Sequence, residues 1–398
     1  MSTFVKSILL SSLVYTWNVG AFEKIALVDS YDFGQVFDTE TRDGTVRIVD
    51  HVLKTGADTI LWRNCSGSLM RYHSTEERAY PTEHPLEKLR LPASGPVYGW
   101  MRLDTAEPDI YRTAMETCAS RKVKRGVHWP YEETHWSSWT LGGWNLAHPQ
   151  YWSVSYDGMP FYGRASLIHP EVVAHKLRLL DELLKRGTDI VYIDLMRNGG
   201  WTPAYEYTPA TRARWVARHG NEPLPKDWRD ERWLALVSEY QHAYLKAVRA
   251  RLDREGRKVR LILGIDHVGR VGRDYNWTDR AIDWRELAAE GVIDAVSVMS
   301  VDLTAIDVKD PWTSTRRVYD SVKRESAGCP VYYPIMAYNF KGRPGFPEYM
   351  KWTKLSAAQT VRKLLDMAHD AGGAGITMEV VDYANYPEAV CAEIQRAR

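Results

Sequence analysis

The sequence of 398 residues lacks a strong net charge and lacks long apolar runs. Lysine and arginine together number 52 and aspartate and glutamate 51, which leaves a formal charge of +1. A chain without an overall positive field has little to attract a polyanion, so nucleic acid is not an expected partner. No uninterrupted apolar stretch approaches the roughly 18 residues of a membrane-spanning helix, so no membrane span is expected.

Cysteine is also scarce. The four cysteines, Cys65, Cys118, Cys329 and Cys391, lie far apart, and none forms a CxxC pair. That spacing argues against a disulfide framework and a zinc ribbon, and it favours cysteines buried as small apolar residues. Cys65 in "RNCSGS" could instead be a nucleophile with His73 as its base, but one cysteine near one histidine is common and the structural role is favoured.

Phenylalanine is the scarce aromatic residue, with 7 copies against 16 tryptophans and 23 tyrosines. Indole and phenol rings combine an apolar face with a polar group. This bias is typical of surfaces where apolar ring faces meet hydroxyl-rich ligands such as carbohydrates.

Residues 1–21 contain a short apolar stretch, "SILLSSLV", which follows Lys6 and precedes Ala21. This arrangement resembles a short signal peptide, which would make the protein extracytoplasmic or secreted. Alternatively, the segment is an N-terminal strand or lid of a cytoplasmic protein. Residues 22–398 are expected to form one catalytic domain.

One local unit recurs along the chain: an amphipathic stretch, a glycine or turn, and then a short apolar run rich in β-branched residues. Runs of this kind are typical of strands that are buried on both faces. Eight strands are expected, within residues 22–31, 55–62, 124–129, 186–195, 254–266, 289–299, 326–338 and 370–380.

The stretches that precede these runs have the signals of helices. One helix is expected after Pro170, which suits a first helical turn, and before Gly187, which suits the residue after a helix end. Ser356 and Gln359 have the spacing of a capping box at the start of another helix. A third helix is expected within residues 228–254.

The alternation of strands and helices predicts an α/β fold with an all-parallel sheet covered by helices. Eight units favour closure into a (β/α)8 TIM barrel, with long inserted loops after strand three (residues 130–168) and strand four (residues 196–227). The alternative is an open doubly wound sheet. It is disfavoured because the turns after the strands carry neither GxGxxG nor GxxxxGK[ST].

In a parallel barrel the carboxyl ends of all strands open into one basin, and the loops that follow carry the chemistry. Asp194 ends the fourth expected strand, and we expect it to face the water-filled mouth of the basin. Polar and aromatic residues at strand ends and in the long loops are the candidates for binding a carbohydrate substrate: Arg63, His128, Trp129, Trp136, Arg197, Trp201, His267, Tyr338 and Asp382.

Hydrolysis of a glycosidic bond needs two carboxyl groups beside the bond, one protonated and one ionised. Asp194 is the first candidate, because Arg197 could keep it ionised as nucleophile or base. Glu379 is the second, because its apolar neighbours in the sequence would favour the protonated form that a general acid needs. Glu133 and Asp266 are rival candidates for the acid.

The run "HWPYEETH" raises a metal site as an alternative, through His128, Glu132 and His135. Its spacing matches neither HExxH nor the HxH of metal-dependent barrel hydrolases. We therefore expect no metal and no other cofactor.

Several runs also resemble a known family: "NLAHPQYW", "ASLIHPEVVAHKLRLLDELLKRGTDIVYIDLMR", "VRLILGIDHVG" and "DWRELAAEGVIDAVSVM". The chain resembles the family-10-like group of predicted bacterial glycosyl hydrolases. That group has a Pro-Glu pair at the start of a helix, here Pro170 and Glu171, and an aspartate at the end of the fourth strand, here Asp194. The resemblance implies a TIM barrel with a carbohydrate-active role.

Together these features predict a glycoside hydrolase that cleaves a complex polysaccharide or an oligosaccharide with two carboxyl groups. Two alternatives stay open. One is a carbohydrate-binding barrel without catalysis, and the other is a metal-dependent barrel hydrolase or lyase.

Overall fold

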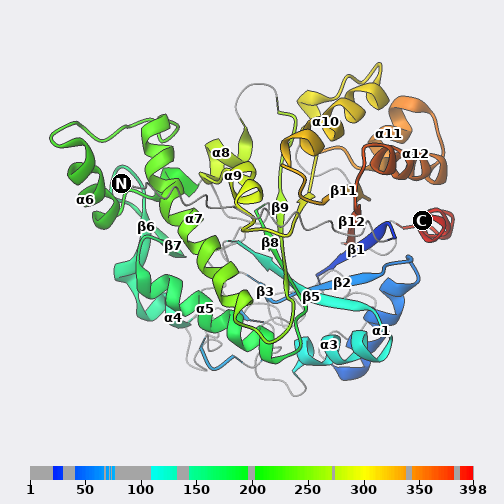
Figure 1. Cartoon of the computed structure of the whole chain (residues 1–398), viewed down its shortest axis with the longest axis horizontal. Coiled ribbons are helices and arrows are strands. Elements are labelled where there is room, and N and C mark those ends of the chain that lie inside the picture. Colours follow the sequence, from blue (N-terminus) through cyan, green and yellow to red (C-terminus); the bar gives the residue numbers. More distant parts are fainter. Residues whose placement is uncertain are drawn as a thin grey trace, which may run out of the picture.

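Eight parallel strands form a closed barrel at the centre of the computed structural model (Figure 1). They follow one another around the ring in chain order, and the last strand pairs with the first. All eight runs expected from the sequence contribute a strand, so the (β/α)8 barrel is confirmed. The barrel strands are β1 (Glu23–Val28), β2 (Thr59–Arg63), β5 (Lys124–Pro130), β8 (Ile190–Asp194), β9 (Arg260–Ile265), β10 (Ala295–Val298), β11 (Val331–Met336) and β12 (Gly375–Val380).

The structure describes most of the chain. The described residues are 21–29, 41–66, 69–70, 72, 74–76, 109–131, 143–195, 202–270, 274–337, 343–380 and 386–397.

A helix follows each barrel strand and lies outside the barrel (Figure 1). In chain order these helices are α1 (Arg42–Leu53), α3 (Ile110–Ser120), α5 (Pro170–Lys185), α7 (Glu231–Asp253), α9 (Trp284–Ala289), α10 (Pro311–Glu325), α12 (Ala357–Asp370) and α13 (Glu388–Arg396). Further elements lie in the connections: β3 (Cys65–Ser66), β4 (Leu69–Met70), α4 (Gly143–Ala147), η3 (Pro149–Tyr151), β6 (Trp152–Val154), β7 (Pro160–Ala165), η4 (Thr202–Tyr205), α6 (Pro209–His219), α8 (Tyr275–Arg280), η5 (Leu303–Ala305) and α11 (Phe346–Thr353).

The ends of α5 and α12 follow from local sequence signals. Pro170 is the first residue of α5, and Gly187 beyond its end has a φ of 89°, a conformation that glycine adopts without strain. At the start of α12, the Ser356 hydroxyl accepts from the Gln359 amide at 3.3 Å, and the Gln359 side chain accepts from the Ser356 amide at 3.0 Å. The predicted capping box is therefore confirmed.

Side chains along the barrel strands alternate between two apolar cores. In β1, Ile25 and Leu27 point into the barrel and pack with apolar side chains of other strands. Ala26 and Val28 point outward and belong to the larger core that the barrel shares with its helices. A residue's position in this alternation therefore decides whether it can reach the basin.

A polar cluster occupies the amino-terminal end of the barrel interior. The Arg260 guanidinium donates to both carboxylate oxygens of Glu23, each at 2.9 Å. Thr59 and Tyr332 each donate a hydroxyl hydrogen bond to Glu23 at 2.6 Å, and the Lys124 ammonium lies at 2.9 Å. Burial opposes ionisation of Glu23, but hydrogen bonds and the charge of Arg260 outweigh it and hold its pKa well below the ordinary value.

The connections after β5 and β8 contact each other beside the barrel, at the left of Figure 1. The Tyr207 amide donates to the Val154 carbonyl at 2.9 Å. Glu206, which is 1% exposed, accepts a hydrogen bond from the Tyr240 hydroxyl at 2.9 Å and another from Ser166. These contacts anchor the described parts of the two connections to each other and to α7.

All four cysteines are free and buried, as predicted. Burial raises the pKa of the Cys118 and Cys329 thiols to about 12, so neither forms a thiolate near neutral pH. Cys65 is fully buried, which favours its structural role, and His73 lies outside the described residues.

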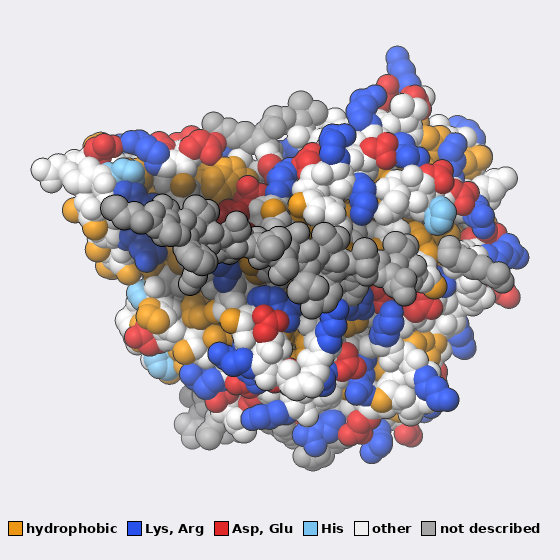
Figure 2. Space-filling model, in the orientation of Figure 1, with side chains coloured by type: hydrophobic (Ala, Val, Ile, Leu, Met, Phe, Trp, Pro, Cys, Tyr) orange, Lys and Arg blue, Asp and Glu red, His pale blue; other side chains and the backbone are white. Residues whose placement is uncertain are grey.

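The surface carries charges of both signs. Figure 2 shows lysine and arginine interspersed with acidic side chains over the described part of one face, in keeping with the net charge of +1. Among the helices of the described ranges, none has the length and apolar character needed to cross a membrane.

We predict that Glu23→Gln lowers the free energy of unfolding by about 3 kcal/mol at pH 7, because it leaves Arg260 buried without its counter-charge. Since the folded-state pKa of Glu23 is depressed, its contribution is complete above the ordinary pKa of about 4.3 and is lost as pH falls further. Urea unfolding of both proteins between neutral and acidic pH measures this difference, which should shrink at low pH.

The matched control is Asp50→Asn, which breaks the exposed ion pair of Asp50 with Arg121. We expect it to change stability much less, because water screens an exposed pair. A cost of Glu23→Gln no larger than that of the control, or a cost independent of pH, would contradict the prediction.

Candidate functional site

Polar side chains gather inside the barrel at the carboxyl ends of its strands. Asp194 lies two residues beyond Tyr192 in β8, and Glu379 lies two residues beyond Thr377 in β12, so each faces the barrel interior. Active sites of TIM barrels lie at this end. The buried polar residues here are Asp29, Arg63, His128, Asp194, Asp266 and Glu379, each at most 5% exposed.

Tyr192 lies inside the barrel, near enough to three of the predicted catalytic carboxylates for their charges to affect its hydroxyl. Burial raises the pKa of the Tyr192 phenol well above its ordinary value. The negative charges of Asp194, Glu379 and Asp266 raise it further. Carboxylates from β8, β12 and the end of β9 are therefore close enough to influence the same hydroxyl.

Gly264 of β9 makes room for this tyrosine. A Cβ atom at Gly264 would lie 2.5 Å from the Tyr192 hydroxyl oxygen and 2.8 Å from two of its ring carbons. No side chain fits there without displacing the ring, so glycine allows Tyr192 to occupy the barrel interior.

Asp194 forms a buried pair with His128. The His128 Nε2 atom lies 2.7 Å from an Asp194 carboxylate oxygen, and the two side chains are 1% and 0% exposed. Asp194 therefore does not face open water, which corrects the expectation of a water-filled mouth. The physical reason is that an imidazole from β5 supplies the hydrogen bond that water would otherwise make.

Arg63 and Asp29 form a second buried pair at the ends of β2 and β1. The Arg63 guanidinium contacts the Asp29 carboxylate. Its expected role in binding substrate stays a prediction. The permanent charge of the arginine compensates the buried aspartate.

Asp266 is held by an arginine that the sequence did not indicate. Arg343 donates to one Asp266 carboxylate oxygen at 2.6 Å. The other oxygen accepts from the His267 backbone amide at 2.9 Å and from the Ser300 hydroxyl. Because Asp266 is fully buried with these donors around it, it is suited to anchoring the loops after β9, β10 and β11.

His267 extends the same network. Arg343 Nε donates to His267 Nε2 at 3.1 Å, so the ring proton lies on Nδ1, which donates to Asp302 at 3.1 Å. The His267 ring also lies 4.6 Å from the ring of Tyr275 in α8. Its φ of 48° is an unusual conformation for a residue other than glycine.

Glu379 is 3% exposed near the end of β12. The adjacent Met378 faces the outer core, the larger core between the barrel and its helices. The Glu379 carboxyl group is therefore buried by the barrel interior rather than by its neighbours in the sequence. The Tyr386 hydroxyl donates to the backbone carbonyl of Ile335 at 2.7 Å and lies 3.4 Å from that of Glu379. Burial raises the pKa of Tyr386 well above its ordinary value, and the charge of Glu379 raises it further.

Trp129 is placed away from this site. It follows His128 directly in β5 and therefore points to the opposite side of the strand. It is 2% exposed in the outer core, a placement that argues against its predicted role in substrate binding.

The remaining predicted residues lie outside the described part of the chain. They are Glu133, Trp136, Arg197, Trp201, Tyr338 and Asp382, together with Glu132 and His135 of the possible metal motif. Within the described ranges, no group of three or more histidine, cysteine or acidic residues could hold a metal ion.

Two residues of the site were missed at the sequence level. Tyr192 had a usable signal, because its position two residues before Asp194 predicts the same strand face. Arg343 had none, because it lies in a connection and its partner Asp266 is 77 residues away.

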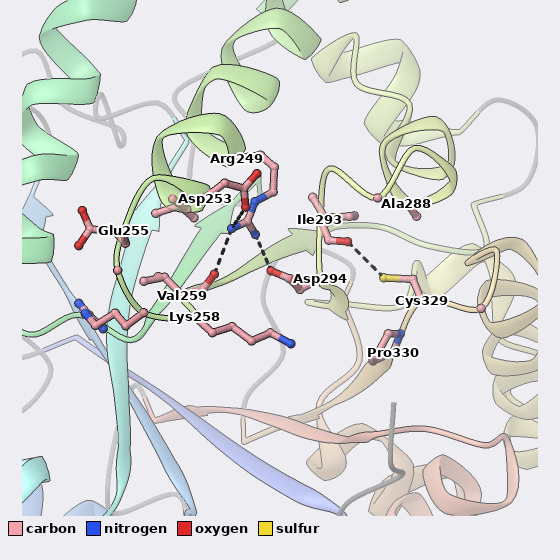
Figure 3. Close-up of a pocket in the computed structure, with 15 residues that line it drawn as sticks. Arg249, Asp253, Glu255, Lys258, Val259, Ala288, Ile293, Asp294, Cys329 and Pro330 are labelled. Carbon is pink, nitrogen blue, oxygen red and sulfur yellow. Dashed lines mark hydrogen bonds and ion pairs between the residues drawn. The ribbon is translucent and has the colours of Figure 1, made fainter. Parts of the chain in front are cut away.

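A cavity of about 780 Å³ lies at the other end of the barrel, at the turns that lead into β9, β10 and β11 (Figure 3). Arg249 in its wall pairs with Asp294 and with Asp253, both at 2.7 Å. Cys329 contacts the Ile293 carbonyl at 3.8 Å. The strand-end carboxylates do not line this cavity, and in TIM barrels this end serves stability rather than catalysis.

No protein-family model and no curated protein matches the sequence. Among solved structures, α-L-fucosidase isoenzyme 2 from Paenibacillus thiaminolyticus matches with a TM-score of 0.55 and 12% identity, over 94% of this chain and 49% of that one. The PgaB (BpsB) glycoside hydrolase domain from Bordetella bronchiseptica matches with a TM-score of 0.57 and 12% identity, over 94% of this chain and 98% of that one. The β-galactosidase from the psychrophilic Marinomonas ef1 matches with a TM-score of 0.57 and 9% identity, over 94% of this chain and 58% of that one.

These matches show the fold alone: a TIM barrel similar to those of glycoside hydrolases. The chain spans about half the length of the fucosidase. The resemblance to the family-10-like group stays a prediction.

We predict that Asp266→Asn and Arg343→Gln each lower the free energy of unfolding by about 3 kcal/mol, because each leaves the other charge buried and uncompensated. The double variant should lose less than the sum, with a coupling of about 1–3 kcal/mol. Urea unfolding of the four proteins measures the coupling. The same cycle on the exposed pair Arg316–Asp320 is the control, and equal coupling in both cycles would contradict the anchoring role.

Proposed function

We propose that this protein is a glycoside hydrolase that cleaves a glycosidic bond of a polysaccharide or oligosaccharide. The observation that carries the proposal is the presence of three buried carboxyl groups, Asp194, Asp266 and Glu379, at the end of the barrel where TIM-barrel enzymes perform their chemistry. The similarity of the fold to barrels of known glycoside hydrolases supports it.

The contacts of the carboxylates favour different roles for them. Asp29 contacts Arg63, and Asp266 contacts Arg343. The permanent positive charge of an arginine suits a carboxylate with a structural role. The described contact of Asp194 is with the His128 imidazole. The N–H group of this ring can orient one carboxylate oxygen of Asp194.

Asp194 is therefore assigned as nucleophile or general base, and Glu379 as general acid. In the proposed step, the protonated Glu379 gives its proton to the glycosidic oxygen as the bond from that oxygen to the anomeric carbon breaks. Asp194 either bonds to the anomeric carbon or takes a proton from the water that attacks it. Glu133, outside the described residues, stays the rival acid. His128 becomes a positioning residue rather than a substrate ligand.

We predict that Asp194→Asn and Glu379→Gln each lower kcat by about 10²–10⁴-fold, because each removes a group that acts in the transition state. New reducing ends released from a panel of polysaccharides measure the activity, and thermal unfolding checks that each variant folds. Asp50→Asn is the control for an exposed carboxylate distant from the site. Unchanged turnover in a folded Asp194→Asn variant would remove this residue from the mechanism.

The complete burial of Asp194 favours a second candidate, a carbohydrate-binding barrel without catalysis. In that case Asp194 and His128 form a purely structural pair. The same panel separates the candidates, because oligosaccharides that bind in calorimetry and yield no product during long incubation indicate binding alone. Activity that a chelator removes and a divalent ion restores would instead support the metal-dependent alternative.

A further inference from the structure

The His128 imidazole contacts a second residue of β8 besides Asp194. His128 of β5 and Tyr192 of β8 are register partners in the parallel pair of these strands, and both side chains face the barrel interior. Their rings stand nearly perpendicular, at an angle of 86°, with centres 5.7 Å apart. Asp194 lies two residues further along β8, so the same imidazole lies against Tyr192 and hydrogen-bonds to Asp194.

Contacts at the far end of the phenol fix the Tyr192 ring. Its hydroxyl donates to the sulfur of Met299, which belongs to the inner core and directly follows β10. The hydroxyl oxygen lies above Gly264 of β9, at a place where a Cβ atom would come within 2.5 Å of it. Burial raises the pKa of the phenol well above its ordinary value, so the hydroxyl stays a donor at neutral pH. The ring cannot turn without losing these contacts.

The neighbours on both sides of His128 restrict its ring. On β2, the register partner of His128 is Arg63, which is held by its ion pair with Asp29. On β8, the phenol of Tyr192 fills the space into which the imidazole would otherwise turn away from Asp194. The orientation of His128 therefore depends on the residues packed around it as well as on its hydrogen bond.

Any influence of Tyr192 on a reaction must pass through another residue. Tyr192 is 0% exposed, so it does not touch a substrate. Of the residues that its side chain contacts, His128 is the one that hydrogen-bonds to a proposed catalytic carboxylate.

We infer that Tyr192 is a positioning residue of the proposed reaction, whose ring holds the His128 imidazole in the orientation in which Nε2 donates to Asp194. The inference rests on the proposed function, in which Asp194 is the nucleophile or general base. Packing of two rings against each other favours one arrangement by an amount that corresponds to about 2- to 10-fold in a rate or an equilibrium constant.

The kinetic test is a cycle of single and double variants with Tyr192→Leu and His128→Gln, measured as reducing ends released from a polysaccharide that the protein cleaves. Tyr192→Leu alone should lower kcat about tenfold and leave KM unchanged, because Tyr192 does not touch the substrate. In the His128→Gln background it should lower kcat no further, because the residue through which it acts is gone. Tyr192→Phe keeps the ring and should keep kcat within about twofold.

A second readout does not depend on activity. With isotope-labelled histidine, nitrogen NMR distinguishes a protonated ring nitrogen from an unprotonated one, and the His128→Gln variant assigns the signals of His128. We expect His128 to carry its proton on Nε2 in the unmodified protein and in Tyr192→Phe, and to populate both tautomers in Tyr192→Leu. Thermal unfolding confirms that each variant folds.

Two further variants complete the test. Gly264→Ala places a methyl group against the Tyr192 ring and should have the same effects as Tyr192→Leu, which it replaces if that variant does not fold. Tyr333→Leu is the control, because it removes another fully buried tyrosine, which stacks on Tyr319 in the outer core with ring centres 4.0 Å apart. It should change neither kcat nor the tautomer of His128.

Losses of kcat that multiply in the double variant, or an unchanged His128 tautomer in a folded Tyr192→Leu variant, overturn the positioning role. The proposed function fails separately. A tautomer that changes in Tyr192→Leu, in a protein that releases no product from any polysaccharide, refutes hydrolysis and keeps the positioning role. Cleavage that depends on Asp194 and is unaffected by Tyr192→Leu keeps hydrolysis and refutes the positioning role.

Discussion

Closure of the barrel places polar side chains where water cannot solvate them, and each buried carboxylate must find its compensation within the protein. At the amino-terminal end, Arg260 compensates Glu23 with two hydrogen bonds from one guanidinium. At the carboxyl end, arginines pair with Asp29 and Asp266. The architecture depends on these partners, because an uncompensated charge inside the barrel would cost more than most single apolar contacts provide.

The two ends of the interior meet this constraint differently. The amino-terminal cluster surrounds one carboxylate, Glu23, with several donors, and such an arrangement is suited to stability. The carboxyl end instead holds three buried carboxyl groups, Asp194, Asp266 and Glu379, at the ends of β8, β9 and β12. Proteins retain a group of buried acidic side chains of this kind where function requires it. This difference between the two ends of the barrel therefore favours the carboxyl end as the site.

Local signals were enough to predict the strands, the limits of α5 and the start of α12, because each depends on neighbouring residues. The strand-end positions of Asp194 and Glu379 followed from the same pattern. The interaction partners of these carboxylates could not be predicted in this way. His128 and Asp194 are 66 residues apart, and only the pairing of β5 with β8 brings them together. The position of Trp129, by contrast, could have been predicted from the sequence. Strict alternation along a strand places it on the opposite face from His128.

The choice of partner also distinguishes the carboxylates chemically. An arginine keeps its charge throughout a reaction, so its contact suits a buried carboxylate that anchors loops. A neutral histidine donates one hydrogen bond and adds no net charge. If positive charge develops at the anomeric carbon, a carboxylate oriented in this way can oppose it. Asp266, held by Arg343, is less suited to that task although it lies equally deep in the barrel.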